Sequence, residues 1–105
     1  MKKIINGTRY DTTKADLIGS TSGGSQSDFR YFHEKLYRTP RSGKFFIHGK
    51  GHGMTRWARI LDGGNSRGWG EGILPISNTE ALEWAEQYMD ADELKKLVGP
   101  RVTSE

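Results

Sequence analysis

The segment 39–43 (TPRSG) separates two stretches of β-rich composition, and it restricts the possible folds more than any other feature of the sequence. Pro40 suits the first central position of a tight turn, and Gly43 can supply a positive φ. Residues 29–38 and 44–48 on either side are rich in aromatic and branched side chains. The sequence therefore predicts a central antiparallel hairpin, with a bulge or a break near 33–34 where the alternation of apolar residues fails.

Other turn signals divide the N-terminal half into further short elements. The Asn-Gly pair at 6–7 tolerates positive φ, so residues 2–5 and 8–10 are expected to form a second hairpin. Residues 17–18 begin a strand, and the Gly, Ser and Thr residues of 19–27 are interpreted as a loop or a flexible edge.

A last short strand is predicted at 71–76. The C-terminal part that follows it has sequence signals for the start and the end of helices. Ser77 and Glu80 match a capping box. The apolar residues after them stand at the spacing of one helical face, namely Ala81, Trp84, Ala85 and Tyr88. A second capping box at 90–93 predicts another short helix, which ends at Gly99.

These elements predict a single α+β domain over residues 1–105, with a frayed tail at 101–105. We expect a small antiparallel sheet of about four to five short strands. Two C-terminal helices and one short N-terminal helix, capped by Asp11 and covering 12–16, would pack on one face. The expected core residues are Phe32, Leu36, Phe45, Ile47 and Trp84.

Composition narrows the classes of site and compartment. The chain has no cysteine, which excludes disulfides and thiolate metal sites. The apolar stretch near the N-terminus is too short for a signal sequence or a membrane span. We therefore expect a cytoplasmic protein that has no membrane partner.

Charge is distributed unevenly along the chain. Residues 1–68 contain thirteen Lys and Arg against five Asp and Glu, whereas residues 69–105 contain three against eight. A dipolar molecule follows only if these segments occupy different faces of the fold, which the sequence leaves open.

Residues 28–59 concentrate seven of the eleven aromatic residues, all three histidines and eight of the sixteen Lys and Arg residues. In a nucleic-acid interpretation, Tyr31, Tyr37 or Phe46 would stack on bases while the cations neutralise phosphates. In a protein-binding interpretation, tyrosine, tryptophan and arginine would form interface hot spots. A third interpretation assigns the aromatic residues to the core and leaves the cations as a solvated surface.

Signals for catalysis or cofactor binding are weak. His33, His48 and His52 could be imagined around a metal ion, but the glycines between the last two argue against helical ligand spacing. The glycine-rich segment 49–53 lacks the ending and helix of a phosphate-binding loop. Glu34, with Asp28, could in principle form an acid–base pair, but nothing in the sequence places them in a cleft. We expect neither enzyme activity nor a cofactor or metal.

Acidic residues form a strip on the predicted C-terminal helix. Glu83, Glu86 and Asp90 fall on the side opposite its apolar face and could imitate a phosphate backbone. The more ordinary interpretation is the solvated side of an amphipathic helix.

Several segments together resemble small proteins encoded by phages and plasmids: 5–12 (INGTRYDT), 27–31 (SDFRY), 34–39 (EKLYRT), 43–46 (GKFF), 49–51 (GKG) and 83–86 (EWAE). Some similar proteins of such mobile genetic elements are anti-CRISPR proteins, which bind and inhibit CRISPR-Cas effector complexes. The chain departs from the pattern at His52, where another glycine is expected.

The resemblance implies an anti-CRISPR inhibitor that binds a Cas effector protein or complex stoichiometrically and blocks DNA binding or nuclease action in a bacterial host cell. The alternative is a small nucleic-acid-binding accessory or regulatory module of a mobile element. The predicted partner-binding residues are Arg30, Tyr31, Arg38, Arg41, Lys44, Lys50, His52 and Arg56. The effector type, the oligomeric state and the roles of the glycine-rich segments 49–53 and 62–70 stay open.

Overall fold

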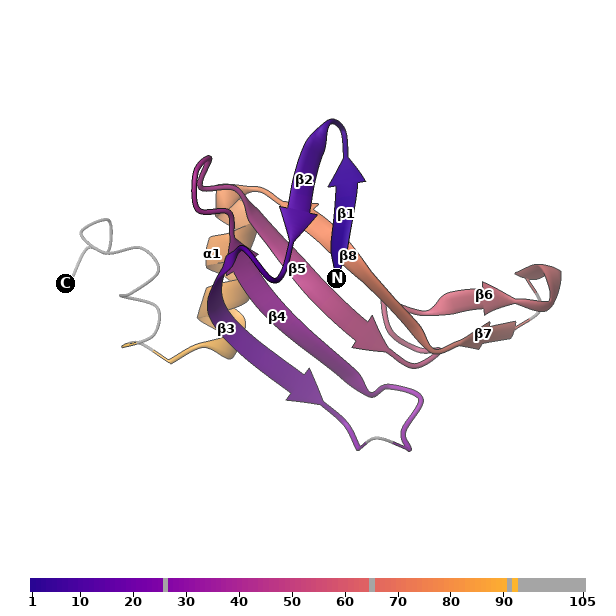
Figure 1. Cartoon of the computed structure of the whole chain (residues 1–105). Coiled ribbons are helices and arrows are strands. Elements are labelled where there is room, and N and C mark those ends of the chain that lie inside the picture. The colour runs from indigo at the N-terminus through magenta and orange to yellow at the C-terminus, as the bar shows by residue number, and fades with distance from the viewer. Residues whose placement is uncertain (26, 65, 91, 93–105) are drawn as a thin grey trace.

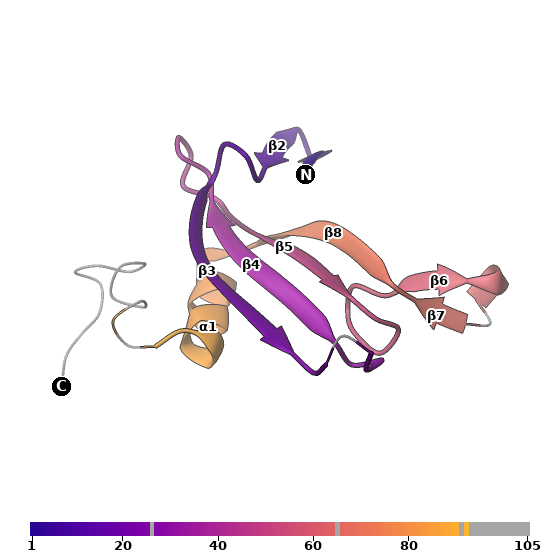
Figure 2. The same ribbon diagram turned by 60° about the horizontal axis from the view of Figure 1, so that its bottom comes forward.

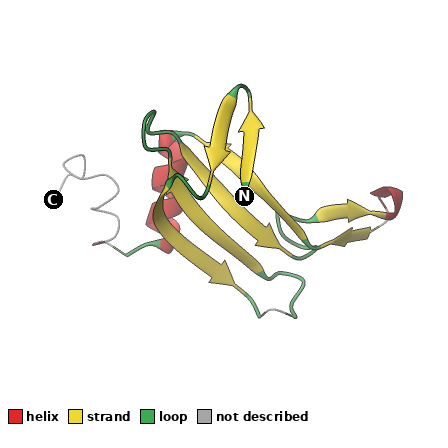
Figure 3. Ribbon diagram, in the orientation of Figure 1, coloured by secondary structure: helices red, strands yellow, loops and turns green. Residues whose placement is uncertain are grey.

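A computed structural model of the chain describes residues 1–25, 27–64, 66–90 and 92. Its centre is a four-stranded antiparallel sheet in the order β3-β4-β5-β8 (Figures 1 and 3). The strands of this sheet are β3 (Asp16–Gly23), β4 (Phe32–Arg38), β5 (Phe45–Gly51) and β8 (Gly70–Ile76). Two separate hairpins pair β1 (Lys2–Ile5) with β2 (Thr8–Asp11) and β6 (Arg59–Leu61) with β7 (Ser66–Gly68), with a short 3-10 turn at Asp62–Gly64.

The central hairpin is confirmed as the pair β4 and β5. Gly43 has a φ of 65° in the connecting turn, and the backbone N–H of Thr39 donates to the carbonyl of Lys44 at 2.8 Å. The two strands pair in an unbroken register, so the predicted bulge or break near 33–34 is wrong. The sheet instead has its irregularity in β3, between Leu17 and Gly19.

The first hairpin is also confirmed, with Asn6 and Gly7 both at positive φ. The segment 19–27 was expected to be a loop or a flexible edge, and its first part is an edge strand, because β3 continues through Gly23. Backbone pairing with β4 holds this strand, although its side chains are small and polar. Gly19 leaves room for Met89, which lies directly over it.

The predicted N-terminal helix at 12–16 is wrong. Asp11 caps a tight turn, accepting hydrogen bonds from the side chain and the backbone N–H of Thr13 at 2.7 and 2.9 Å. These bonds, which outweigh the effect of burial, lower the pKa of Asp11. Strand β3 begins at Asp16, so the chain has no room to extend the turn into a helix.

Within the described residues the structure has one α-helix, α1 (Asn78–Tyr88). Its capping box is confirmed, because the Glu80 N–H donates to the Ser77 side chain and the Ser77 N–H donates to Glu80. The first of the two expected C-terminal helices is therefore confirmed. The second predicted helix and the tail 101–105 lie outside the described residues, apart from positions 90 and 92 at the start of that helix.

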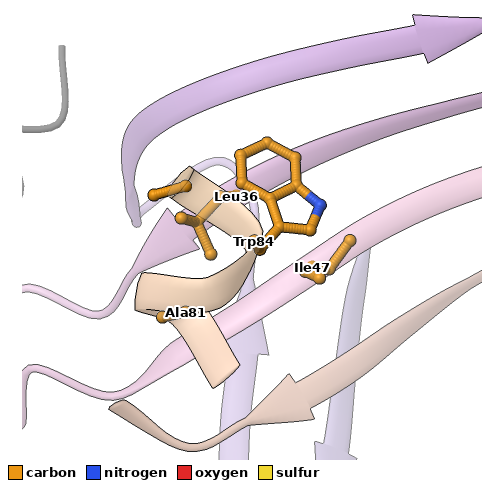
Figure 4. Packing of buried hydrophobic residues seen from close by; sticks show 5 residues of the cluster. Leu36, Ile47, Ala81 and Trp84 are labelled. Atoms are coloured by element: carbon orange, nitrogen blue, oxygen red, sulfur yellow. The ribbon is translucent and has the colours of Figure 1, made fainter. Parts of the chain in front are cut away.

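Two apolar clusters lie on opposite faces of the sheet. Figure 2 shows the elements that cover these faces, α1 on one side and the β1–β2 hairpin on the other. On one face α1 packs against β4 and β5, with Trp84 beside Leu36 and Ile47 (Figure 4). The other face is covered at one end by the β1–β2 hairpin. Its buried cluster consists of Tyr10, Tyr37, Phe46 and Ile73.

Candidate functional site

The β1–β2 hairpin lies over only one end of its face of the sheet (Figure 1). Toward the other end, side chains of this face are partly or fully exposed. Side chains alternate between the two faces of a strand, and the registers of β4, β5 and β8 are regular. Residues that are paired across the three strands therefore point to the same face and form rows perpendicular to the strands. We define the open face as the partly or fully exposed residues Tyr31, His33, Lys35, His48, Lys50, His52, Trp69 and Glu71.

Three rings form an aromatic cluster at the end of the open face away from the β1–β2 hairpin. Tyr31 and Trp69 are nearly parallel, with ring centroids 6.0 Å apart and planes at 13°. The ring of His52 meets Trp69 edge-on at 4.8 Å. The carbonyl of Tyr31 accepts a hydrogen bond from the backbone N–H of His52, so the ladder of β4 and β5 extends under the cluster. Trp69 remains 43% exposed.

The middle of the open face carries imidazole and ammonium groups. His33 is opposite Lys50 in the register, and Lys35 is opposite His48. Burial and the nearby Lys35, Lys50 and His48 lower the pKa of His33. His48 Nε2 lies 2.7 Å from a carboxylate oxygen of Glu71, the one acid among the residues of this face. This surface is electrostatically suited to an anionic ligand.

A different polar cluster lies on the α1 side, around the buried carboxylate of Glu34. One carboxylate oxygen accepts from Arg56 Nη2 at 2.9 Å and from Trp84 Nε1 at 2.8 Å. The other accepts from Arg56 Nε at 2.9 Å and from Trp57 Nε1 at 2.7 Å. This arrangement joins β4 to α1 and to the segment after β5.

The four N–H donors determine the pKa of Glu34 and its capacity to accept a proton. Burial alone would raise its pKa, but the bonds from Arg56, Trp84 and Trp57 outweigh burial and hold the pKa below its usual value. Both oxygens already accept two hydrogen bonds, which leaves little capacity to take a proton from a substrate. Glu34 therefore acts in this structure as a connecting group.

A groove of about 590 Å³ runs beside Glu34, between α1 and the segment 54–57. Its walls include Phe32, Trp57 and Tyr88, together with Arg30 and Glu83. The aromatic residues of the lining are buried or half-buried, whereas its charged residues Arg30, Arg56 and Glu83 are exposed. The groove lies on the opposite side of the sheet from the open face.

The eight predicted partner-binding residues fall in three places. The open face contains Tyr31, Lys50 and His52. The end of the sheet at the β4–β5 turn contains Arg38, Arg41 and Lys44. The groove on the α1 side contains Arg30 and Arg56. The structure therefore does not bring these eight residues together in one surface.

Two residues that were considered for base stacking are core residues. Tyr37 is 8% exposed and Phe46 is fully buried, and their rings stack on each other beneath Tyr10. Neither side chain is available to a ligand in this fold. The aromatic residues at the surface of this face are instead Tyr31 and Trp69.

Sequence reasoning missed His33, Lys35, His48, Trp69 and Glu71 as members of one surface. A signal was present in β5, where His48 and Lys50 alternate with glycines, but in β4 the charged Glu34 stands between His33 and Lys35 and hides it. Using it requires the register of β4, β5 and β8, which connects residues more than thirty positions apart.

The predicted acidic strip lies on the helix side. Glu83, Glu86 and Asp90 are exposed, and Glu83 lines the groove. The lysines of the open face project from the other side of the sheet. The carboxylates of α1 and the lysines of the open face thus lie on opposite sides of the sheet, although Arg30 and Arg56 also lie on the helix side and Glu71 lies on the open face.

Comparisons of this chain with protein-family models, with curated proteins and with solved structures found no match. No group of three or more potential ligands among the described residues could hold a metal ion. In the same part of the chain, no helix is long and apolar enough to cross a membrane.

Proposed function

We propose that this protein binds nucleic acid non-covalently through the open face, with no catalytic step. The observation that supports this best is the gathering of Lys35, Lys50 and three histidines beside two partly exposed aromatic rings. The exposed carboxylates of α1 project from the other side, where they would not repel a phosphate backbone. Cations that contact phosphates release counterions, which favours binding at low salt.

The test is fluorescence anisotropy of a labelled single-stranded 12-mer over a series of salt concentrations. The double variant Lys35→Ala, Lys50→Ala removes two phosphate contacts and should reduce the slope of log K against log salt by about 1.4. The matched control is Lys3→Ala, Lys14→Ala, which removes two exposed lysines elsewhere. Absence of binding at low salt, or an equal loss in the control pair, would contradict the proposal.

A second candidate is inhibition of a CRISPR-Cas effector complex by stoichiometric binding, which the sequence resemblance implies. The observation in its favour is a set of exposed carboxylates on the α1 side of the sheet: Glu83 and Glu86 of α1, with Asp90 just beyond the end of the helix. The channels that hold nucleic acid in such effectors are positively charged, so a row of carboxylates could occupy one.

Capture of a named Cas subunit by tagged protein, with and without nuclease, separates the two candidates. Nuclease-resistant capture that is lost in Glu83→Lys, Glu86→Lys supports inhibition by the acidic strip. Resistant capture that is lost in Arg38→Glu supports docking by the β4–β5 turn. Arg56 is unsuitable for this test because its reversal would also disrupt the ion pair with Glu34. Capture that disappears on nuclease treatment supports nucleic-acid binding.

A further inference from the structure

We infer that the ligand of the open face is a single-stranded segment of nucleic acid, whose unpaired bases stack on the aromatic cluster while Lys50 and Lys35 contact its phosphates. This inference rests on the proposed function and specifies its ligand. It assigns separate roles to the two ends of the open face. The aromatic end holds bases, and the middle of the sheet holds the backbone.

The aromatic cluster has the geometry of a stacking platform. Tyr31 and Trp69 are nearly parallel, and the edge-on ring of His52 supports Trp69 from the side. Phe29, which is 68% exposed, lies next to His52 with ring centroids 6.5 Å apart. Every base has a π-face, so such rings bind single strands with little dependence on sequence. A base within a duplex already stacks on its neighbours and cannot use the platform.

The cations continue from the platform in rows along the strands. Two residues along a strand span about 7 Å, so Lys50 and His33 lie one row from the aromatic cluster, and Lys35 and His48 lie two rows away. Beyond them the β1–β2 hairpin covers the face over Tyr37. The open face thus has room for a short stretch, about two or three nucleotides, which is the number that comparable open sheets stack.

The width of the sheet argues against a duplex. Four strands spaced about 4.8 Å apart span about 14 Å, whereas a DNA major groove is about 12 Å wide and admits a helix or a two-stranded ribbon. In this molecule the β6–β7 hairpin has that ribbon form and projects beyond the sheet (Figure 1). Its exposed Arg59 and Arg67 would be the contacts if the ligand were a duplex.

The experiment compares three labelled probes on the full chain: a single-stranded DNA 12-mer, the same strand with abasic sites throughout, and a 12-bp duplex. We expect the single strand to bind at least tenfold more tightly than either other probe. Trp69→Ala should weaken single-strand binding by about tenfold or more, and Trp69→Phe should restore much of it. The matched control is Ile60→Ala, which truncates an apolar side chain that is 69% exposed.

The outcomes separate this inference from the proposed function. Equal affinity for the abasic strand, or duplex binding that depends on Arg67 and not on Trp69, overturns base stacking and leaves nucleic-acid binding in place. Failure of all three probes to bind at low salt overturns both. A circular-dichroism melt of Trp69→Ala checks that the variant is folded. If Trp69→Ala does not fold, the abasic comparison on the unmodified protein decides.

Discussion

At the scale of single residues, Glu34 joins three parts of the fold through four side-chain hydrogen bonds. The side chain is 4% exposed. Three of its hydrogen bonds come from Arg56 and Trp57 in the segment after β5, and the fourth comes from Trp84 in α1. Arg56 also lies over the ring of Trp57, 5.3 Å from its centroid. In the described part of the chain, every buried side-chain nitrogen and oxygen has a hydrogen-bond partner. For the indole N–H groups of Trp57 and Trp84, that partner is the carboxylate of Glu34.

Glu34→Ala should therefore lower the free energy of unfolding by about 2–4 kcal/mol, because two indole N–H groups lose their acceptor. Arg56 contributes less to the loss, since its side chain is 48% exposed and can turn to water. Urea unfolding followed by circular dichroism measures the change. Glu83→Ala, an exposed carboxylate on α1, is the control and should stay within about 0.5 kcal/mol. A loss as small as that of the control would show that the cluster does not stabilise the fold.

The same carboxylate predicts a dependence of stability on pH. Because the pKa of Glu34 is lowered in the folded state, its contribution is present above the unfolded pKa of about 4.5 and is lost as the pH falls through the folded value. The unmodified protein should therefore lose more stability between pH 6 and pH 3 than Glu34→Gln. The pKa values of Asp11 and Glu80 are also lowered, so some sensitivity to acid remains in both proteins. Equal losses of stability in the two proteins would contradict the view that ionised Glu34 stabilises the folded state.

At the scale of elements, glycines in β5 and β8 make space for the segment that crosses the sheet beside α1. Gly49 and Gly72 are paired in the register, and Trp57 lies over both. A Cβ atom at Gly49 would overlap the indole, whereas one at Gly72 would lie at an ordinary 3.8 Å from it. This segment carries Arg56 and Trp57 to Glu34, so the glycine in β5 supports the polar cluster.

Gly49→Ala should destabilise the protein by about 1–3 kcal/mol, because Trp57 must move from its position over β5. Gly72→Ala is the matched control and should have little effect. Thermal melts of the two variants provide the comparison. Equal melting temperatures would mean that Trp57 does not need its position over Gly49.

Elements with strong local signals were predictable, and elements held by neighbours were not. Asn6 and Gly7 specify their turn through φ, and Ser77 caps α1 with its own side chain. The segment 19–23 has no such signal and becomes a strand only because β4 lies beside it. Asp11 shows the limit of local reasoning, because the same side chain can cap a helix or a turn.

At the scale of the whole molecule, the fold brings all three histidines to one face. His33 is surrounded by Lys35 on its own strand and by Lys50 and His48 on β5, while its partner on β3 is the uncharged Ser22. Tyr31 is the remaining titratable neighbour along β4. A phosphate placed among these groups would favour the protonated imidazole and raise the pKa of His33.

Binding should then be coupled to proton uptake. We expect the affinity for the single-stranded 12-mer to increase as the pH falls from 8 to 6, by up to about tenfold per pH unit for each proton taken up. His33→Gln should reduce this dependence while the salt slope due to the lysines persists. Anisotropy titrations at constant ionic strength test both statements. An affinity that does not change with pH would exclude His33 from contact with the ligand.

The sequence by itself determined the features that depend on residues close together along the chain: the two hairpin turns, the capped helix and its buried face with Trp84. The tertiary structure decided which residues share a surface. It assigned Tyr37 and Phe46 to the core, placed Glu34 under α1, and brought Trp69 beside Tyr31. The physical reason is that turn and helix geometry depend on local dihedral angles and capping groups. A sheet face depends on strand order and register, which are set by the packing of segments far apart in the chain.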